Sequence, residues 1–172
     1  IERFDDEGRF LRLDYPDFVL INFYIPHGGR EKENLDYKLN VYQHIFEYLQ
    51  TIKKDVIMLG DFNIAHKEID LARPKQNQNN IMFTSQEREQ IDKLIKFGFA
   101  DTFRAFNKSD GYYTWWPYAV DARERNLGWR LDYIFTSTAL TPKLQNAFIF
   151  KDVEGSDHCP VGIVIKNSEY RN

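Results

Sequence analysis

Short apolar runs bounded by turn residues predict a series of β-strands along the chain. Residues 8–15 alternate between apolar and polar in the manner of a half-buried strand, and residues 17–26 form a more apolar run that ends at a proline. A third apolar run covers residues 55–60. Later strands are expected over 130–135, over 146–153 and at the end of 155–165.

Two helices are expected between these strands. Apolar residues recur at helical spacing from Leu35 to Ile52, and Thr84 with Glu87 three positions later has the pattern of a capping box for a second helix ended by Gly98. Residues 99–106 suggest one or two short helical turns. Strands and helices interleave, which predicts an α/β or α+β fold with layered packing. We expect one domain over residues 1–172, incomplete at its N-terminus because the first strand begins abruptly.

Composition is that of a globular protein, with 42% hydrophobic and 28% charged residues. No apolar run is long enough to span a bilayer, and no secretory leader opens the sequence, so an intracellular location is expected. The single Cys159 excludes an intrachain disulfide framework. The net charge of −3 gives no overall nucleic-acid signal, so basic groups for a phosphate polymer would have to be concentrated locally.

The run at 55–60 breaks directly into the polar sequence Gly60-Asp61-Phe62-Asn63. In an extended chain Asp61 and Asn63 point to the same side, while Phe62 points into the core. Ligands of α/β proteins tend to bind beyond the carboxyl ends of strands, so the two polar side chains are candidates for a site. The alternative is a plain turn, in which Gly60 bends the chain and both side chains bond the local backbone.

Three other predicted strands also have polar residues at an end. Each has a structural explanation: Tyr24 as a half-buried strand residue, Asp132 as a partner of Arg130 or Arg125, and residues 156–158 as a turn. A sheet that brings all four strand ends together would instead place these residues in one site.

The residue types suit hydrolysis of a phosphoester. Carboxylates can hold a hard divalent cation and accept a proton, and Mg²⁺ uses one or two of them beside water and substrate phosphate. An imidazole can stabilise charge on the phosphate, and Asn63 and Tyr24 supply neutral donors. The carboxylates are Asp61, Asp132 and Asp157, and the imidazole is His158. Metal-assisted attack of water fits this set, whereas a phosphate-binding loop, a nucleophile elbow and zinc-ligand spacing are missing from the sequence.

Several motifs resemble exonuclease III-type apurinic/apyrimidinic endonucleases, a branch of the endonuclease/exonuclease/phosphatase superfamily. They are GDFNIAHKEID, DTFR, YTWW, NLGWRLDY and GSDHCP. GDFN and SDH alone would indicate only the superfamily, which also contains DNase I-like nucleases, inositol-phosphate phosphatases and sphingomyelinases. YTWW followed by NLGWRLDY narrows the resemblance to the DNA-repair branch. It covers Phe10 to Val164, essentially the whole chain.

The resemblance implies the C-terminal part of a four-layer, DNase I-like α/β sandwich of two packed sheets. The family's first segment, with one strand bearing an Asn and another bearing a metal-binding Glu, has no counterpart here. Apolar faces and strand edges that normally pair are therefore expected to be exposed.

Site roles follow from the resemblance residue by residue. Asp61 would position or deprotonate the attacking water, Asn63 would orient it, and Tyr24 would donate to the phosphate. His158 would stabilise charge on the phosphate, with Asp132 holding its imidazole. Asp157 would bind Mg²⁺ together with the missing Glu, and Mn²⁺ is a substitute. The expected metal-ligand set is Asp157, Asp61, Asn63 and His158. The family's usual Asn or Gln after the proline of the Tyr24 motif is His27 here.

Double-stranded DNA with abasic sites or 3′ ends is the partner that the resemblance implies. The candidate contacts are Arg30, Arg123, Arg125, Asn126 and Trp129. We expect Trp129 near the site and Trp115 in the core. Arg104 is expected to form an internal ion pair, and Asp70 and Asp101 to be structural.

Three hypotheses about function remain open on the sequence. The first is Mg²⁺-dependent incision 5′ to abasic sites, with 3′-exonuclease or 3′-phosphatase activity, by an enzyme that is a monomer at full length and cytoplasmic, or nucleoid-associated if prokaryotic. The second is an inactive or weak truncated fragment that binds DNA or self-associates through sheet edges. The third is a relative acting on phosphoinositides or phospholipids.

Overall fold

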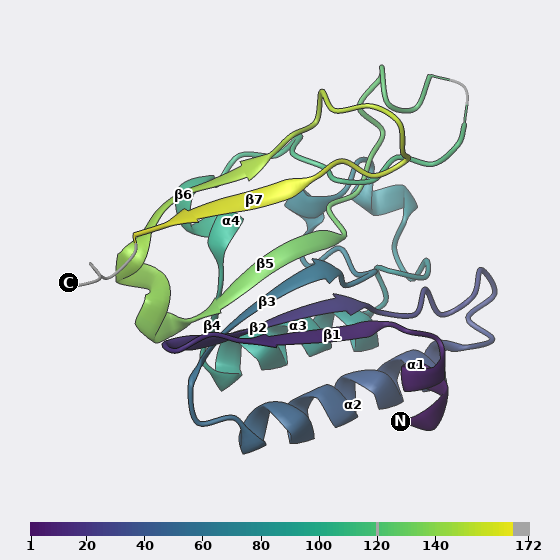
Figure 1. Cartoon of the computed structure of the whole chain (residues 1–172). Coiled ribbons are helices and arrows are strands. Elements are labelled where there is room, and N and C mark those ends of the chain that lie inside the picture. The colour runs from purple at the N-terminus through teal and green to yellow at the C-terminus, as the bar shows by residue number, and fades with distance from the viewer. Residues whose placement is uncertain (120, 167–172) are drawn as a thin grey trace.

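A five-stranded mixed sheet forms the centre of the computed structural model, which describes residues 1–119 and 121–166 (Figure 1). Its spatial order is β1-β2-β3-β5-β4. The strands are β1 (Phe10–Asp14), β2 (Phe18–Tyr24), β3 (Asp55–Asp61), β4 (Phe99–Asp101) and β5 (Asp132–Ser137). The β2–β3 pair is parallel and the other pairs are antiparallel.

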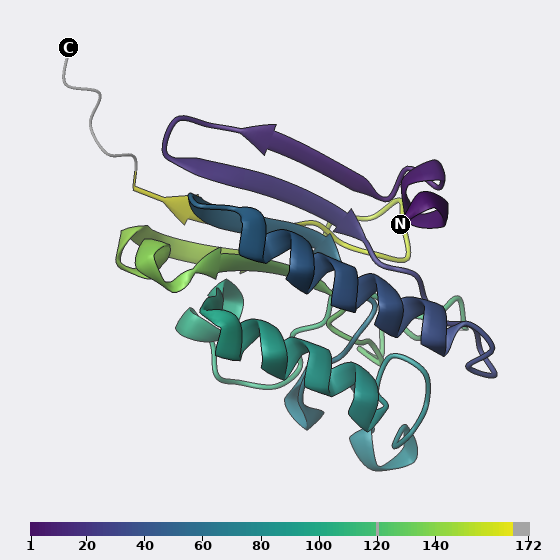
Figure 2. The same ribbon diagram turned by 90° about the horizontal axis from the view of Figure 1, so that it is seen from below.

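Two long helices, α2 (Leu35–Thr51) and α3 (Ser85–Phe97), lie side by side on one face of this sheet (Figures 1 and 2). Their apolar faces pack on the sheet and form the main core, in which Ile21, Val41 and Met58 are fully buried. A second, two-stranded sheet of β6 (Leu144–Ile149) and β7 (Val161–Ile165) covers part of the opposite face. The described part of the chain is therefore layered as helices, sheet and hairpin.

The pattern-based predictions of the long elements are confirmed. The predicted capping box is present, because the Thr84 side chain accepts from the Glu87 amide while Glu87 accepts from the Thr84 amide. Gly98 ends α3 in the left-handed conformation, with φ 110°. The α/β class expected from interleaved strands and helices is the class observed.

Two short elements differ from the sequence-based prediction. Helix α1 (Glu2–Asp6) was not expected, and residues 99–101 form strand β4 rather than a helical turn. The short helix α4 (Thr102–Phe106) follows β4 and agrees with the helical turns expected there. Strand β4 exists because it pairs with residues 135–137 of β5, a partner that local sequence does not show. Single 3₁₀ turns occur at Glu68–Asp70, Pro74–Gln76 and Thr138–Lys143.

The register of the central strands aligns three polar strand ends in one row. Tyr24 of β2 pairs with Asp61 of β3, and Asp61 pairs with Asp132 of β5. The close approach of β2 and β3 requires Gly60, because a Cβ at that position would lie 2.0 Å from the carbonyl oxygen of Phe23. The strand order therefore gathers residues 24, 61 and 132 at one edge of the sheet.

Strand β1 lies at the edge of the sheet and carries exposed leucines. Leu11 is 54% exposed and Leu13 is 44% exposed, on the face of the sheet away from α2. The exposed apolar surface and the free strand edge that were expected are thus present at β1. Within the described residues, a search for helices long and apolar enough to cross a membrane finds none.

Candidate active site

The turn after β3 holds Asp61 and Asn63 in fixed positions. The Asn63 amide N–H donates to Oδ1 of Asp61 (2.8 Å), and Nδ2 of Asn63 donates to Oδ2 of Asp61 (2.9 Å) and to the carbonyl of Ile25 (2.8 Å). Asn63 adopts a left-handed backbone with φ 50°, which Asn tolerates well. Phe62 between them is buried in the core. The turn expected as the alternative for this stretch is therefore confirmed, with Asn63 beyond the end of β3, and the site expected there stays a prediction.

Asp132 and His158 form a hydrogen-bonded pair beside this turn. Nδ1 of His158 lies 2.8 Å from Oδ2 of Asp132. The structural explanation for Asp132, pairing with a neighbouring arginine, is wrong for Arg130, whose guanidinium bonds Asp70 and Asp101 instead. Thr114 fixes the start of β5 through hydrogen bonds from the Leu131 and Asp132 amides to its hydroxyl. Asp132 is thus free to hold the imidazole.

The pKa values of Asp61 and His158 are both raised, for different physical reasons. Desolvation, followed by repulsion from Asp132, raises the pKa of Asp61 to about 7, although His158, the Asn63 amide and Lys38 act in the opposite sense. Burial disfavours the charged form of His158, but its hydrogen bond to Asp132 and the nearby carboxylates outweigh this and raise its pKa. The site therefore combines an acid that titrates near neutrality with an imidazole that is readily protonated.

Tyr24 stands at the end of the same row and is 53% exposed. The guanidinium of Arg9 lies 4.5 Å from the centroid of its ring, and Nη1 of Arg9 donates to the Tyr24 carbonyl (3.3 Å). Sequence reasoning did not single out Arg9. The antiparallel pairing of β1 with β2 places Arg9 beside Tyr24. The sequence around Arg9 does not predict this contact, because it depends on which strand pairs with β1.

The indole of Trp115 holds the side chain of Asp157 in place. Nε1 of Trp115 donates to its Oδ2 (3.0 Å), and the rings of Trp115 and His158 are 6.5 Å apart between centroids. Burial opposes the charge on Asp157, but this hydrogen bond and others lower its pKa overall. The prediction that Trp115 lies in the core is wrong: it is partly exposed and contacts the site.

Trp129, in contrast, packs inside the protein. It is 8% exposed and meets the ring of Phe83 edge-to-face, at 6.3 Å between centroids. Trp129 also lines a cavity together with Trp115, so its predicted place near the site stays a prediction. Trp115 bridges Trp129 on one side and His158 on the other, so the tertiary pairing places Trp115 nearer the histidine. The alternation of apolar residues along the sequence does not show which of the two tryptophans pairs with His158.

A cavity of about 990 Å³ opens beside the strand ends. Three segments line it: the loop after β2, the segment before α3, and the tryptophan region. The lining residues are His27, Arg30, Glu31, Lys32, Asn80, Ile81, Met82, Trp115, Pro117, Tyr118, Ala119 and Trp129. Asp61 and His158 are not among them. Trp115 lies between the cavity and the candidate catalytic residues, since it lines the cavity and its indole donates to Asp157, the neighbour of His158.

The predicted DNA-contact residues divide into two groups. Arg30, at the rim of the cavity, and Arg125 are exposed. Arg123 instead donates to the carbonyls of Ser156, Lys151 and Val153 and stacks over Trp116. Asn126 bonds the carbonyl of Gly111 and the indole of Trp116. For Arg123 and Asn126 the structure therefore supports a bracing role, because their polar atoms are engaged within the protein.

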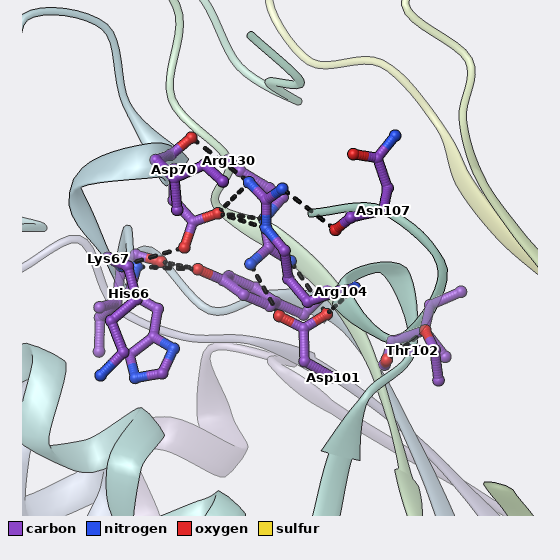
Figure 3. A network of polar contacts seen from close by, with 12 residues as sticks. His66, Lys67, Asp70, Asp101, Thr102, Arg104, Asn107 and Arg130 are labelled. Carbon is purple, nitrogen blue, oxygen red and sulfur yellow. Dashed lines mark hydrogen bonds and ion pairs between the residues drawn. The ribbon is translucent and has the colours of Figure 1, made fainter. Parts of the chain in front are cut away.

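Figure 3 shows an ion-pair network of Asp70, Asp101, Arg104 and Arg130. Asp70 accepts from Arg104 (2.6 Å) and from Arg130 (2.8 Å), and Asp101 accepts from Arg130 (2.7 Å). The internal ion pair expected for Arg104 and the structural role expected for the two aspartates are thus observed. Arg130 lies two residues before β5, so the network anchors the start of the strand that carries Asp132.

The chain matches the sequence model of the Endonuclease/Exonuclease/phosphatase family over residues 1–158. It belongs to this family. An exodeoxyribonuclease of Bacillus subtilis is 41% identical over 168 residues, which are 96% of this chain and 67% of that protein. The DNA repair nuclease APEX1 of Danio rerio is 41% identical over 95% of this chain and 54% of its own length. The structure of an AP endonuclease from Archaeoglobus fulgidus superposes with a TM-score of 0.86 at 30% identity, covering 93% of this chain and 66% of that one.

These comparisons confirm the family and the α/β fold expected from the motifs. The chain spans about half to two thirds of the length of these members of the family. Its four predicted metal ligands are engaged with protein partners: Asp61 with Asn63, His158 with Asp132, and Asp157 with Trp115. Among residues 1–119 and 121–166, no three His, Cys, Asp or Glu side chains gather closely enough to hold a metal ion. The described residues offer single carboxylates suited to a hard cation that takes most of its ligands from water and phosphate.

Proposed function

We propose that this chain carries the catalytic residues of a DNA-repair phosphodiesterase that incises DNA 5′ to abasic sites and also acts at 3′ ends, as a 3′-exonuclease or 3′-phosphatase. One observation carries the proposal. Asp132 pairs in strand register with Asp61 and holds the imidazole of His158, next to an aromatic-lined cavity. The printed names of relatives, an exodeoxyribonuclease, a DNA repair nuclease and an AP endonuclease, support the same substrate class.

Asp61 is the group that accepts the proton of the attacking water. Its pKa of about 7 lets it take up a proton near neutral pH, when a carboxylate of ordinary pKa would be a weak base. The water oxygen forms a bond to phosphorus and its proton passes to Asp61, while the bond from phosphorus to the 3′ oxygen breaks and that oxygen takes a proton from solvent water. Asn63 holds the carboxylate in place through two hydrogen bonds, which keeps the base oriented during the reaction.

His158 stabilises the charge that develops on the phosphate oxygens. Asp132 binds Nδ1 and so leaves Nε2 to face the substrate as a donor. Tyr24, beside Asp61 in the register, supplies a hydroxyl donor, and Arg9 above its ring adds positive charge. Donors fixed before the reaction contribute most of the catalysis of such hydrolyses.

Mg²⁺, or Mn²⁺ in its place, belongs to the proposal because the acceptors at the strand ends are hard oxygens. Asp157 and Asp61 are the carboxylates of this chain that would hold it, beside water and substrate phosphate. When bound, the cation would neutralise charge on the phosphate and polarise the bond under attack.

The DNA would lie across the cavity. Arg30 and Lys32 at its rim are placed to neutralise backbone phosphates, and Tyr118, which is 90% exposed, extends the aromatic surface. Trp115 and Trp129 form an apolar wall that suits a nucleotide lacking its base. Double-stranded DNA inside the cell, bound by a monomer at full length, is the proposed setting.

A second candidate function rests on the exposed edge of β1. Leu11 and Leu13 leave apolar surface and an unpaired strand edge in the described structure, which favours self-association of this chain. In that case the chain would be an inactive or weak fragment that binds DNA or itself.

An incision assay separates these two candidates. The substrate is a duplex oligonucleotide with one abasic site, incubated with the chain in Mg²⁺ and in EDTA, with Asp61→Asn and the exposed-site variant Glu89→Gln as controls. Nicking 5′ to the abasic site that needs Mg²⁺, survives Glu89→Gln and is lost in Asp61→Asn supports the first. A folded chain that shifts the duplex in a gel, or sediments as a dimer, but does not nick it supports the second.

A further inference from the structure

The side chain of Lys38, on α2, is completely buried, with 0% of it exposed. Its Nζ donates to the carbonyl of Asn63 (2.6 Å), to the carbonyl of His27 (3.0 Å) and to Oε1 of Glu87 (2.6 Å). The ammonium group thus uses all three of its protons inside the protein. A lysine is almost never buried in this way unless it is paired.

Glu87 is as fully engaged as its partner. Its Oε1 also accepts from the Met82 amide (3.0 Å), and its Oε2 accepts from the Thr84 amide (3.0 Å) and the Thr84 hydroxyl (2.8 Å). The acid that caps α3 therefore also fixes the segment 81–84 in front of that helix. Ile81 and Met82 in this segment line the cavity beside the strand ends.

Two of the bonds from Lys38 end on backbone carbonyls close in sequence to candidate catalytic residues. His27 belongs to the loop that follows Tyr24, and Asn63 is the residue that holds Asp61. A third element, α3, is joined through Glu87. The ammonium group of Lys38 thus sets the spacing between the loop after β2, the turn after β3 and residues 81–84, of which Ile81 and Met82 line the cavity.

We infer that Lys38, braced by Glu87, is a positioning residue for the proposed hydrolysis: it fixes the turn of Asp61 and Asn63 relative to the loop that follows Tyr24. The expected effect of Lys38 on the reaction rate rests on the proposed function. Its effect on the positions of the two loops rests on its three hydrogen bonds alone.

A role in packing alone does not explain this arrangement. Burying an ammonium and a carboxylate costs several kcal/mol per ion, and apolar residues of similar volume often replace such a pair without loss of stability. What an apolar pair cannot supply is a bond to two specific carbonyls. Misplacing a reacting group by about 1 Å can cost on the order of 10²-fold in rate, so precise spacing of the two loops has a direct kinetic consequence.

The test compares Lys38→Met, which removes the charge and the donors, with Lys38→Arg, which keeps both. Lys96→Met, at an exposed lysine of α3, is the matched control. With the 172-residue chain and the abasic duplex, we expect Lys38→Met to lower kcat by about 10- to 100-fold while KM changes less than about threefold. Lys38→Arg should recover part of the loss, and Lys96→Met should match the unmodified chain.

Amide hydrogen exchange provides the readout that does not need activity. In Lys38→Met the amides of residues 25, 27, 28 and 62–65 should exchange faster, while those of β5 and of residues 45–50 of α2 stay as slow as before. Equal acceleration throughout the chain, or a KM effect without a kcat effect, would overturn the inference.

The two proposals can fail separately. If the unmodified chain does not nick the duplex, the proposed function fails, and local exchange at the two loops still decides whether Lys38 sets their spacing. If Lys38→Met does not fold, Glu87→Gln replaces it, because this change keeps the shape of the partner and removes its charge. It should give a smaller kcat loss with the same local exchange pattern, and an unchanged kcat with unchanged exchange would contradict the inference.

Discussion

The imidazole of His158 is held by Asp132, with 2.8 Å between Nδ1 and Oδ2, although the two residues are 26 positions apart in the chain. The carboxylate comes from the first residue of β5 and the histidine from the loop before β7. Their contact depends on the packing of the β6–β7 hairpin over the central sheet.

Asp132→Asn should lower the incision rate by about 10²- to 10³-fold, because the imidazole loses the partner that fixes its orientation and favours its charged form. The pKa of His158 should fall, since the hydrogen bond and charge of Asp132 are what raise it. Single-turnover incision and an NMR titration of the histidines in EDTA measure both effects. His66, which bonds Asp92, is the internal control and should not change. An unshifted His158 would contradict the assignment.

Asp61→Asn should remove incision and stabilise the fold at alkaline pH. The folded pKa of Asp61 is about 7 and its ordinary value 3.8, so between these values the native state binds more protons than the unfolded state. Stability from this group therefore falls as pH rises from about 4 to 7. The melting temperature of the variant should be above that of the unmodified chain at pH 8 and close to it at pH 4. Each kcal/mol of added stability should raise the melting temperature by about 2–4 °C. Thermal melts at both values test this, with the exposed-site variant Glu89→Gln as control.

Asp70→Asn should destabilise the protein at neutral pH. Burial opposes the charge on Asp70, but the guanidinium groups of Arg130 and Arg104 outweigh it and lower its pKa. A carboxylate with a lowered pKa contributes stability that is present above its unfolded pKa and is lost as pH falls through the folded value. We expect a loss of about 3–5 kcal/mol at pH 7 in urea unfolding. The loss should shrink below pH 3, and a constant difference at all pH values would argue against it.

The two tryptophans should respond differently to replacement by alanine. Trp129→Ala removes a buried side chain and should cost about 3–5 kcal/mol of stability. Trp115→Ala, at a partly exposed residue that bonds Asp157, should instead weaken binding of an abasic duplex by about tenfold or more while costing less stability. Fluorescence anisotropy with labelled duplex and urea unfolding separate the effects. The reverse pattern would contradict this division of roles between the two tryptophans.

Arg30→Ala and Arg123→Ala test the division among the predicted DNA contacts. Arg30 is exposed at the cavity rim, so its loss should weaken DNA binding at all sequences and reduce the salt dependence by about one phosphate contact. Arg123 braces three backbone carbonyls, so its loss should lower the melting temperature and leave the salt slope of binding nearly unchanged. Affinity measured at several salt concentrations decides between them.

Much of the fold can be read from local patterns. The helical apolar spacing after Leu35, the capping box at Thr84 and Glu87 and the ending at Gly98 all lie within a few residues of one another, and each matches the structure. Strand β4 and helix α1 were not predicted, because β4 is stabilised by pairing with β5 and α1 is too short to show a period.

The candidate site shows the same division. Its residue types and the turn at Asp61 and Asn63 could be read from the sequence, because the hydrogen bonds of that turn act within three residues of the end of β3. The interior bonds of Arg123 and the partial exposure of Trp115 could not, because each depends on contacts between segments distant in sequence.

By itself, the sequence determined the kinds of elements, the chemistry available at their ends and the family to which the chain belongs. The tertiary structure decided which of those ends meet: β3 between β2 and β5, His158 against Asp132, and a buried Lys38 beneath both loops. The physical reason is that periodicity and capping act over a few residues, whereas strand order, burial and the pKa values they produce arise from the packing of the whole chain.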